Sequence, residues 1–214
     1  MIVPSSSWNR DRRRRVCTLG LAASWAILCG VRVHWAIVLL GLLAFAATPA
    51  TADQTDKRLD ALFAQLKAAH AYAQAQPAEA AVWGIWSETD DTAARILLGD
   101  GIGAMARRDY RMALEKFDQI VKIAPDFAEG WNKRATVNYL IGLYPASLSD
   151  IEKTLELEPR HFGALAGRGL VLIELHEEAL ALDSFEAALA IHPTLPGATA
   201  NSKILRKRLK DRAV

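Results

Sequence analysis

Few side chains in this sequence combine the type and spacing that catalysis requires. After residue 52 the histidines are His70, His161, His176 and His192. No two of them share the i, i+4 spacing that places two imidazoles on one helical face to bind zinc, as in HExxH. His161 and His192 stand beside prolines and His176 stands between two predicted helices. We therefore expect these three histidines to lie in exposed turns.

Two other chemical motifs can be weighed in the same way. Residues 99–103, GDGIG, have the glycine content of a phosphate-binding loop, but no strand pattern precedes them and no GK[ST] follows. No GxSxG nucleophile elbow occurs. Both cysteines, Cys17 and Cys29, precede residue 53, which excludes disulfides, zinc thiolates and a cysteine nucleophile from the rest of the chain. We expect a protein that is not an enzyme and has no cofactor or metal.

The elements that would position any site follow a fixed interval, because Pro125, Pro159 and Pro193 stand 34 residues apart. Relative to these prolines, small and bulky apolar residues recur at the same places in each unit. The small residues are Gly101, Ala135 and Gly169, then Ala113, Ser147 and Ala181; the bulky ones are Phe117, Ile151 and Phe185. Small residues let paired helices approach closely, and bulky ones fill the space beside them. Each unit is thus predicted to be a pair of helices, ended by its proline.

This period and these positions resemble the tetratricopeptide repeat (TPR), a 34-residue unit of two antiparallel helices. The tryptophan of its fourth position survives as Trp131, and the tyrosine that begins its second helix survives as Tyr110 and Tyr144. The resemblance implies an all-α solenoid of TPR helical hairpins, because neither helix of a pair can bury its apolar face alone.

Six segments are expected along the chain. They are 1–52, a signal peptide or N-terminal anchor; 53–93, a degenerate helix pair; 94–127, 128–161 and 162–195, the three consensus repeats; and 196–214, a basic C-terminal capping helix.

The degenerate pair is predicted to consist of one helix over residues 53–76 and a second that begins at Pro77 and ends near residue 88. We expect this pair to cover the exposed apolar end of the first repeat, since terminal units of solenoids are usually atypical. Trp83 and Trp86 would then pack against Leu97 and Leu98. The two tryptophans could instead form an aromatic ligand site.

In the TPR family, five positions of each first helix face a concave groove. Carried onto this chain, these positions are Arg95, Leu98, Ile102, Met105, Ala106, Glu129, Asn132, Thr136, Tyr139, Leu140, Gly163, Ala166, Leu170, Ile173 and Glu174. The set is apolar at its ends and polar in the middle, which suits an extended or helical peptide. The resemblance therefore implies a non-catalytic adaptor that binds a protein or peptide. The competing interpretation is that the terminal helix covers some of these positions and leaves no open site.

One branch of the family, the heat-shock cochaperones, holds two carboxylates of its ligand in a polar clamp. That clamp needs lysine and asparagine where this chain has Leu98 and Ile102, and asparagine where Lys133 stands. The resemblance therefore does not imply recognition of such C-terminal peptides.

Residues 33–52 have the pattern of a secretory signal. An apolar run over residues 35–47 is followed by Ala50-Thr51-Ala52, an A-x-A cleavage site. Since a second apolar stretch precedes it, we hypothesise a true start near Val31 or Val33. The alternative is an uncleaved anchor with Arg10–Arg15 on the cytoplasmic side. Both place the repeats in a bacterial periplasm.

Charge separates the two parts of the chain. The first 52 residues carry six arginines and one acid, and the remainder has 20 basic and 23 acidic residues, which argues against a nucleic-acid partner. The terminal helix is nevertheless basic, through Lys203, Arg206, Lys207, Arg208, Lys210 and Arg212. It is expected to be a solvated cap. Alternatively, contact with anionic headgroups would make the protein a membrane-associated accessory subunit of an envelope assembly.

Overall fold

The computed structural model describes residues 56–212, so the predicted signal, cleavage site and start lie outside the described residues. The described residues fall within a single compact unit. They are α-helical, without a strand in this part of the chain. The helices are α2 (Lys57–Ala68), α3 (Tyr72–Trp86), α4 (Thr92–Ala106), α5 (Tyr110–Ile123), α6 (Ala128–Leu140), α7 (Tyr144–Leu157), α8 (Phe162–Glu174), α9 (Glu178–Ile191) and α10 (Pro196–Arg212).

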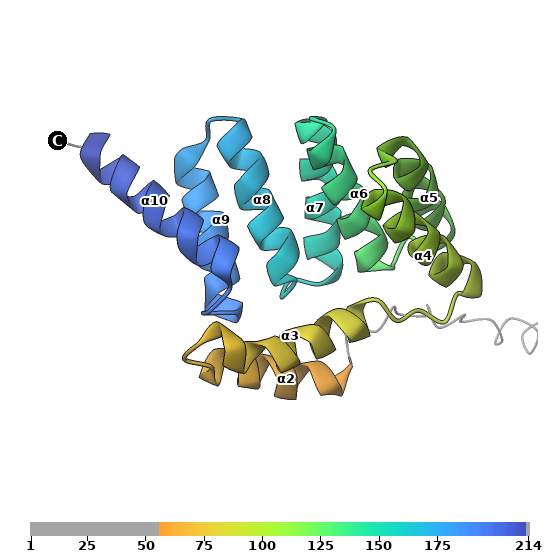
Figure 1. The fold of residues 1–214 in the computed structure, drawn as a ribbon, viewed down its shortest axis with the longest axis horizontal. Coiled ribbons are helices and arrows are strands. Elements are labelled where there is room, and N and C mark those ends of the chain that lie inside the picture. Colours follow the sequence, from red (N-terminus) through yellow and green to blue (C-terminus); the bar gives the residue numbers. More distant parts are fainter. Residues whose placement is uncertain (1–55, 213–214) are drawn as a thin grey trace, which may run out of the picture. The chain divides into compact units, whose positions relative to one another are not determined.

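Helices α4 to α9 form three antiparallel pairs that stack in chain order (Figure 1). The second helices of the pairs begin at Tyr110, Tyr144 and Glu178, which are 34 residues apart. Each second helix packs on its own first helix and on the first helix of the next pair. The predicted all-α solenoid of helical hairpins is confirmed.

Four of the described helices, α2, α4, α5 and α8, begin where a side chain accepts a hydrogen bond from a free backbone N–H group. Asp91 caps α4 by accepting from the N–H of Ala94 at 2.9 Å, and Asp109 caps α5 by accepting from the N–H of Met112 at 3.0 Å. Such caps stabilise a helix by about 1 kcal/mol. These two caps set where the two helices of the first hairpin begin.

Within a pair, glycine and phenylalanine determine how closely the two helices approach. A Cβ atom added at Gly169 would lie 2.7 Å from Cζ of Phe185, and Gly101 faces Phe117 in the same way. Both phenylalanine side chains are fully buried. The repeated small and bulky residues of the sequence are therefore partners across each hairpin.

Polar pairs join the two helices of each hairpin at equivalent positions, but their chemistry changes along the array. The pair is Asp100 with Lys116 in the first hairpin, Arg134 with Asp150 in the second, and Arg168 with Ser184 in the third. The middle pair is bidentate, with N–O distances of 2.6 and 3.0 Å. Arg134 also reaches Asp118 of the preceding hairpin at 2.8 Å, so this residue links two repeats.

The predicted break between the first two helices is wrong. The chain turns after Ala68, and Pro77 lies inside α3 rather than at the start of a helix. Pro77 is exposed, so the carbonyl that loses its N–H partner there faces water. The buried stripe of Ala75, Ala78, Val82 and Ile85 continues past the proline and holds the helix together.

The predicted position of this helix pair is also wrong. Figure 1 shows α2 and α3 running across the ends of α7, α8 and α9 instead of stacking on α4. The hydrophobic core of the α2–α3 pair includes Phe162 of α8, and Ile191 and Leu195 pack against this core. Arg160 adds an ion pair with Asp60 at 2.6 Å. The pair thus lies on the turns that join successive repeats, and Ile96 on the first repeat is left 59% exposed.

At the other end, α10 packs on α9 through buried Ala198, Ser202 and Leu205. Neighbouring Ile204 is 48% exposed. Arg206 pairs with Glu186, while Arg208 and Arg212 both pair with Glu178. Three of the six basic residues predicted on this helix are therefore paired with two carboxylates of α9. No helix between residues 56 and 212 is long and apolar enough to cross a membrane.

Candidate peptide-binding groove

The first helices of the pairs lie on the inner side of the array. Helices α6 and α8 contact each other more extensively than the second helices of neighbouring pairs do. Because each repeat turns relative to the last, the helices that come closest together line the concave side. Side chains on the free face of α4, α6, α8 and α10 can therefore meet a ligand.

Two rows of these side chains are open. The row nearer the middle of the helices contains Ile102, Thr136, Leu170 and Ile204, and the row nearer their ends contains Met105, Tyr139 and Ile173. Ile102 and Ile204 are 43% and 48% exposed. The other five are half-buried, and Met105, Tyr139, Leu170 and Ile173 also pack against the hydrophobic core. Ile204 comes from α10, which the sequence analysis treated only as a cap. The rows form an apolar strip with one hydroxyl and one phenol, which suits a peptide side chain.

Polar groups border this strip on α7 and α8. The phenol of Tyr144 donates a hydrogen bond to Glu174 at 3.3 Å, and its ring lies 6.0 Å from that of Tyr139. Partial burial, with the nearby charge of Glu174, raises the pKa of both tyrosines, so their phenols remain protonated donors. Sequence reasoning missed Tyr144 because its place at the start of a second helix is a family packing position.

The remaining predicted groove residues differ in accessibility. Arg95 and Glu174 are exposed, and Ala166 is partly buried. Leu98, Glu129 and Asn132 are buried, with at most 7% of their surface accessible. The structure therefore does not leave these three open, and two residues of the predicted polar middle, Glu129 and Asn132, are internal, whereas Thr136 and Tyr139 remain partly exposed.

Glu129 is the centre of that internal polar group. Its carboxylate accepts from Nδ2 of Asn132 at 2.9 Å and lies 3.2 Å from Nε2 of His161 and 2.8 Å from Nζ of Lys133. Burial alone would raise its pKa, but the hydrogen bond with His161 and the charge of Lys133 outweigh burial and leave the pKa below its ordinary value. The residue is therefore an ionised structural anchor.

Comparison with known proteins identifies the family to which this arrangement belongs. No family model matches the sequence. Over 153 residues, however, the chain is 34% identical to a TPR repeat-containing protein of Rhizobium etli, and the match spans 72% of this chain and 75% of that one. The chain belongs to the tetratricopeptide-repeat family. A match to the human SGT1 homolog, at 33% identity over 84 residues, spans 38% of this chain and 22% of that protein's length.

Solved TPR structures share the fold at low identity. The first TPR of Spaghetti (RPAP3), bound to the HSP90 peptide SRMEEVD, aligns with a TM-score of 0.55 at 19% identity over 57% of this chain and 97% of that one. The Sgt2 TPR domain of Aspergillus fumigatus aligns with the same score at 18% identity over 60% of this chain and 85% of its own. These likenesses concern the TPR fold alone.

The histidine prediction is wrong for two of the three turn residues. His161 and His192 are fully buried. His161 caps α8 by accepting from the N–H of Ala164 at 3.0 Å, so its Nδ1 is unprotonated and Nε2 is free to donate to Glu129. His176 is exposed, as predicted, in a turn with φ of 62°. Among the described residues, no three His, Cys, Asp or Glu side chains group as a metal site would require.

The tryptophan prediction also needs correction. Trp86 stacks on the ring of His161 with centroids 4.1 Å apart, and Trp83 meets Phe162 edge-on at 5.5 Å. They pack on the third repeat rather than on Leu97 and Leu98 of the first. The one sequence feature related to this placement is Gly163, because Trp83 occupies the space that a side chain there would take.

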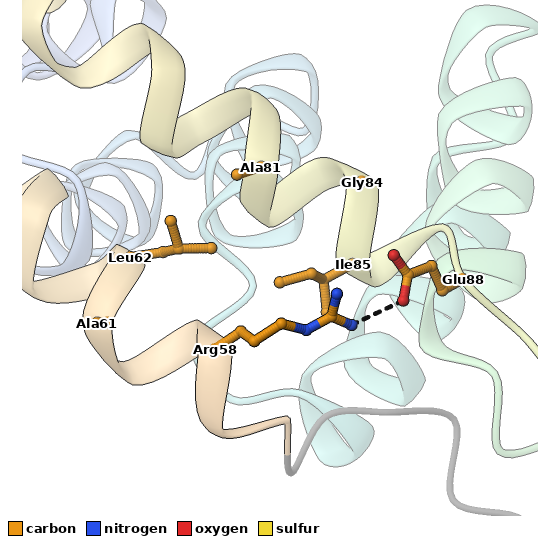
Figure 2. Close-up of a pocket in the computed structure, with 7 residues that line it drawn as sticks. All are labelled: Arg58, Ala61, Leu62, Ala81, Gly84, Ile85 and Glu88. Carbon is orange, nitrogen blue, oxygen red and sulfur yellow. Dashed lines mark hydrogen bonds and ion pairs between the residues drawn. The ribbon is translucent and has the colours of Figure 1, made fainter.

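A shallow hollow also lies between α2 and α3. Figure 2 shows its lining, in which Arg58 reaches Glu88 at 2.8 Å across one end. Its volume is about 570 Å³, and the remaining lining residues are small or apolar: Ala61, Leu62, Ala81, Gly84 and Ile85. With its cation already paired, this hollow has no free charged group to select a ligand.

Proposed function

We propose that this TPR protein is a non-catalytic adaptor that binds a peptide or protein segment in its concave groove. The observation that carries the proposal is the pair of open rows on the first helices. Apolar side chains that keep part of their surface exposed at equivalent positions of neighbouring helices can form a binding surface. The aliphatic residues of the strip, Ile102, Leu170 and Ile173, come from two different repeats, so the binding surface depends on the stacked array.

The groove chemistry indicates which segment would fit. The Spaghetti TPR structure holds an HSP90 peptide ending in EEVD. Of the three clamp positions, Leu98 is buried and Ile102 is apolar, so neither can donate to a carboxylate. The third, Lys133, already pairs with Glu129 at 2.8 Å. We expect a partner segment with aliphatic or aromatic side chains for the strip. Glu174 would accept a hydrogen bond from a donor beside them.

The test selects binders from a displayed library of random linear peptides, using the full chain as target. Leu170→Glu places a charge in the middle of the strip. Ser149→Glu is the matched control, since it places the same charge at an exposed position of α7. Apolar peptides should bind the control as they bind the wild type. They should bind Leu170→Glu at least ~tenfold more weakly, a loss of about 1.4 kcal/mol. Equal affinity for both variants would exclude the groove.

Asn132 is not suitable for this test. It is 7% exposed and donates to Glu129, so its replacement would alter packing and binding together. Tyr139 is partly exposed and remains a useful second position.

We further propose that the repeats act outside the cytoplasm, after export by the signal pattern of residues 33–52. The support is the apolar run followed by Ala50-Thr51-Ala52. Mass analysis of the protein from its producing cell should give a chain that begins at Asp53. A retained N-terminal segment in the membrane fraction would instead indicate an anchor, and a full-length soluble chain would refute export.

A further inference from the structure

One end of the concave side is already filled by this chain. Gly163 holds the second position of the first helix of repeat three, a position that faces the groove in this family. A Cβ atom there would lie 2.5 Å from Cη2 and 2.9 Å from Cζ2 of Trp83, so the indole occupies the space of the missing side chain. Nζ of Lys133 lies 5.3 Å from the centre of the same indole. Trp83 is thus held as a ligand's aromatic side chain would be.

A second aromatic contact lies one turn further along α3. Trp86 is 5% exposed and lies parallel to His161, with an angle of 10° between the rings. Its ring centre is also 5.1 Å from that of Phe162. Each such ring pair stabilises the contact beyond the area that it buries. The surface therefore contacts two indoles spaced three residues apart.

A carboxylate completes the pattern on α3. Oε2 of Glu79 lies 3.5 Å from Nε2 of buried His192. Glu79, Trp83 and Trp86 stand at i, i+4 and i+7, which places them on one face of the helix. The turns between repeats thus contact an acidic side chain followed by two aromatic ones, the face of a particular amphipathic helix.

This contact buries polar atoms without partners. Nε1 of Trp86, Oε2 of Glu158, Nδ1 of His192 and Oγ1 of Thr194 are buried and accept or donate no hydrogen bond. All four belong to α3 or to the two turns that it covers. A buried polar group left unpaired loses its hydrogen bonds to water without gaining others, which lowers the stability of the contact. The contact is therefore held less tightly than its aromatic area suggests, and a segment that opens at low cost can exchange with a competitor.

We propose that α3 is a resident ligand of the surface formed by the turn residues His161 and His192, by Phe162 and Gly163 at the start of α8, and by Lys133 of α6. In trans, this surface takes a partner helix that carries a carboxylate and two aromatic residues at i, i+4 and i+7. The inference goes beyond the proposed groove function, because it uses the surface beside the inter-repeat turns and stands whether or not the open rows bind a peptide.

The experiment uses the full chain with Trp83 and Trp86 both changed to alanine, which removes the anchors of α3 in cis. The probe is a fluorescein-labelled peptide with the sequence of residues 72–88, followed by anisotropy. The double variant should bind the probe at least ~tenfold more tightly than the wild type, since its own α3 no longer competes as a tethered ligand. Equal binding to both proteins overturns the proposal.

Two controls establish that the probe binds at the space beside Gly163. A probe with alanine at both tryptophan positions should not bind the double variant. Adding Gly163→Leu to that variant fills the space that Trp83 occupies, so it should abolish binding of the original probe. Binding that survives either change contradicts the assignment.

Hydrogen exchange on the wild type decides the matter if the double variant does not fold. Amides of α3 should exchange at least ~tenfold faster than those of α8, because the helix pair opens without unfolding the repeats. Exchange of α3 and α8 at the same rate would show that the pair is a fixed part of the core and would refute the proposal. These tests leave Leu170 unchanged, which is the position that the test of the groove varies. Their failure would therefore not refute the proposed groove function.

Discussion

Glu129 shows how one residue can combine a family groove position with an internal structural role. Its second-position register would turn it toward a ligand, but His161 and Lys133 draw its carboxylate inside. A carboxylate with a depressed pKa in the folded protein stabilises the fold at pH above its unfolded value and loses this effect as the pH falls through the folded value. The relevant window therefore lies below the ordinary value of 4.5.

Glu129→Gln should lower the free energy of unfolding by about 1–3 kcal/mol at pH 7, because it removes the charge that Lys133 and His161 contact. As the pH is lowered below 4.5, the wild type should lose stability more steeply than the variant, and the two should converge. Urea unfolding at a series of pH values measures both effects. Glu156→Gln is the matched control, since that carboxylate is 65% exposed and its removal should change stability little. A parallel pH dependence of wild type and Glu129→Gln would contradict the role assigned to Glu129.

At the scale of elements, the helices of the repeats were predictable because small and bulky residues recur at one period. Gly101 and Phe117 form a contact between helices adjacent in sequence, so pattern alone predicts it. Pro77 misled the prediction because the sequence does not show which side of a helix faces water. The stripe through Ala75 and Val82 outweighs one missing hydrogen bond on an exposed face.

The placement of α2 and α3 was not predictable for a different reason. It depends on residues 87–91, which join the end of α3 to the first repeat, and on contacts such as that between Trp83 and Gly163, 80 residues apart. The 34-residue period of the repeats does not relate Trp83 to Gly163. The burial of Glu129, His161 and His192 follows from this placement, so the same gap explains why the candidate site was only partly predicted.

Two glycines of α4 provide a matched test of the hairpin packing. Gly101→Ala puts a methyl group against the ring of Phe117 and should destabilise the protein by about 1–3 kcal/mol through overpacking. Gly99→Ala meets no atom within 4 Å and should stabilise it by up to about 1 kcal/mol through helix propensity. Thermal unfolding of both variants gives the comparison. If Gly101→Ala were as stable as Gly99→Ala, the close approach at Phe117 would not hold.

At the scale of the whole molecule, the stacked hairpins divide the inner surface into two parts. The end nearest the inter-repeat turns is covered by α3, and the rows from Ile102 to Ile204 remain open. Because each repeat supplies only a few side chains to these rows, no single hairpin forms the surface. The central claim is therefore that a partner binds at the open rows.

Photo-crosslinking tests this central claim most directly. A photoreactive phenylalanine derivative is placed at Ile173 in the open row, or at Ser149 on exposed α7, in the full chain made in its producing cell. The account predicts that Ile173 gives an adduct with one defined protein, that Leu170→Glu removes this adduct, and that Ser149 does not give it. The same adduct from Ser149, or an adduct at Ile173 that persists with Leu170→Glu, would contradict the claim.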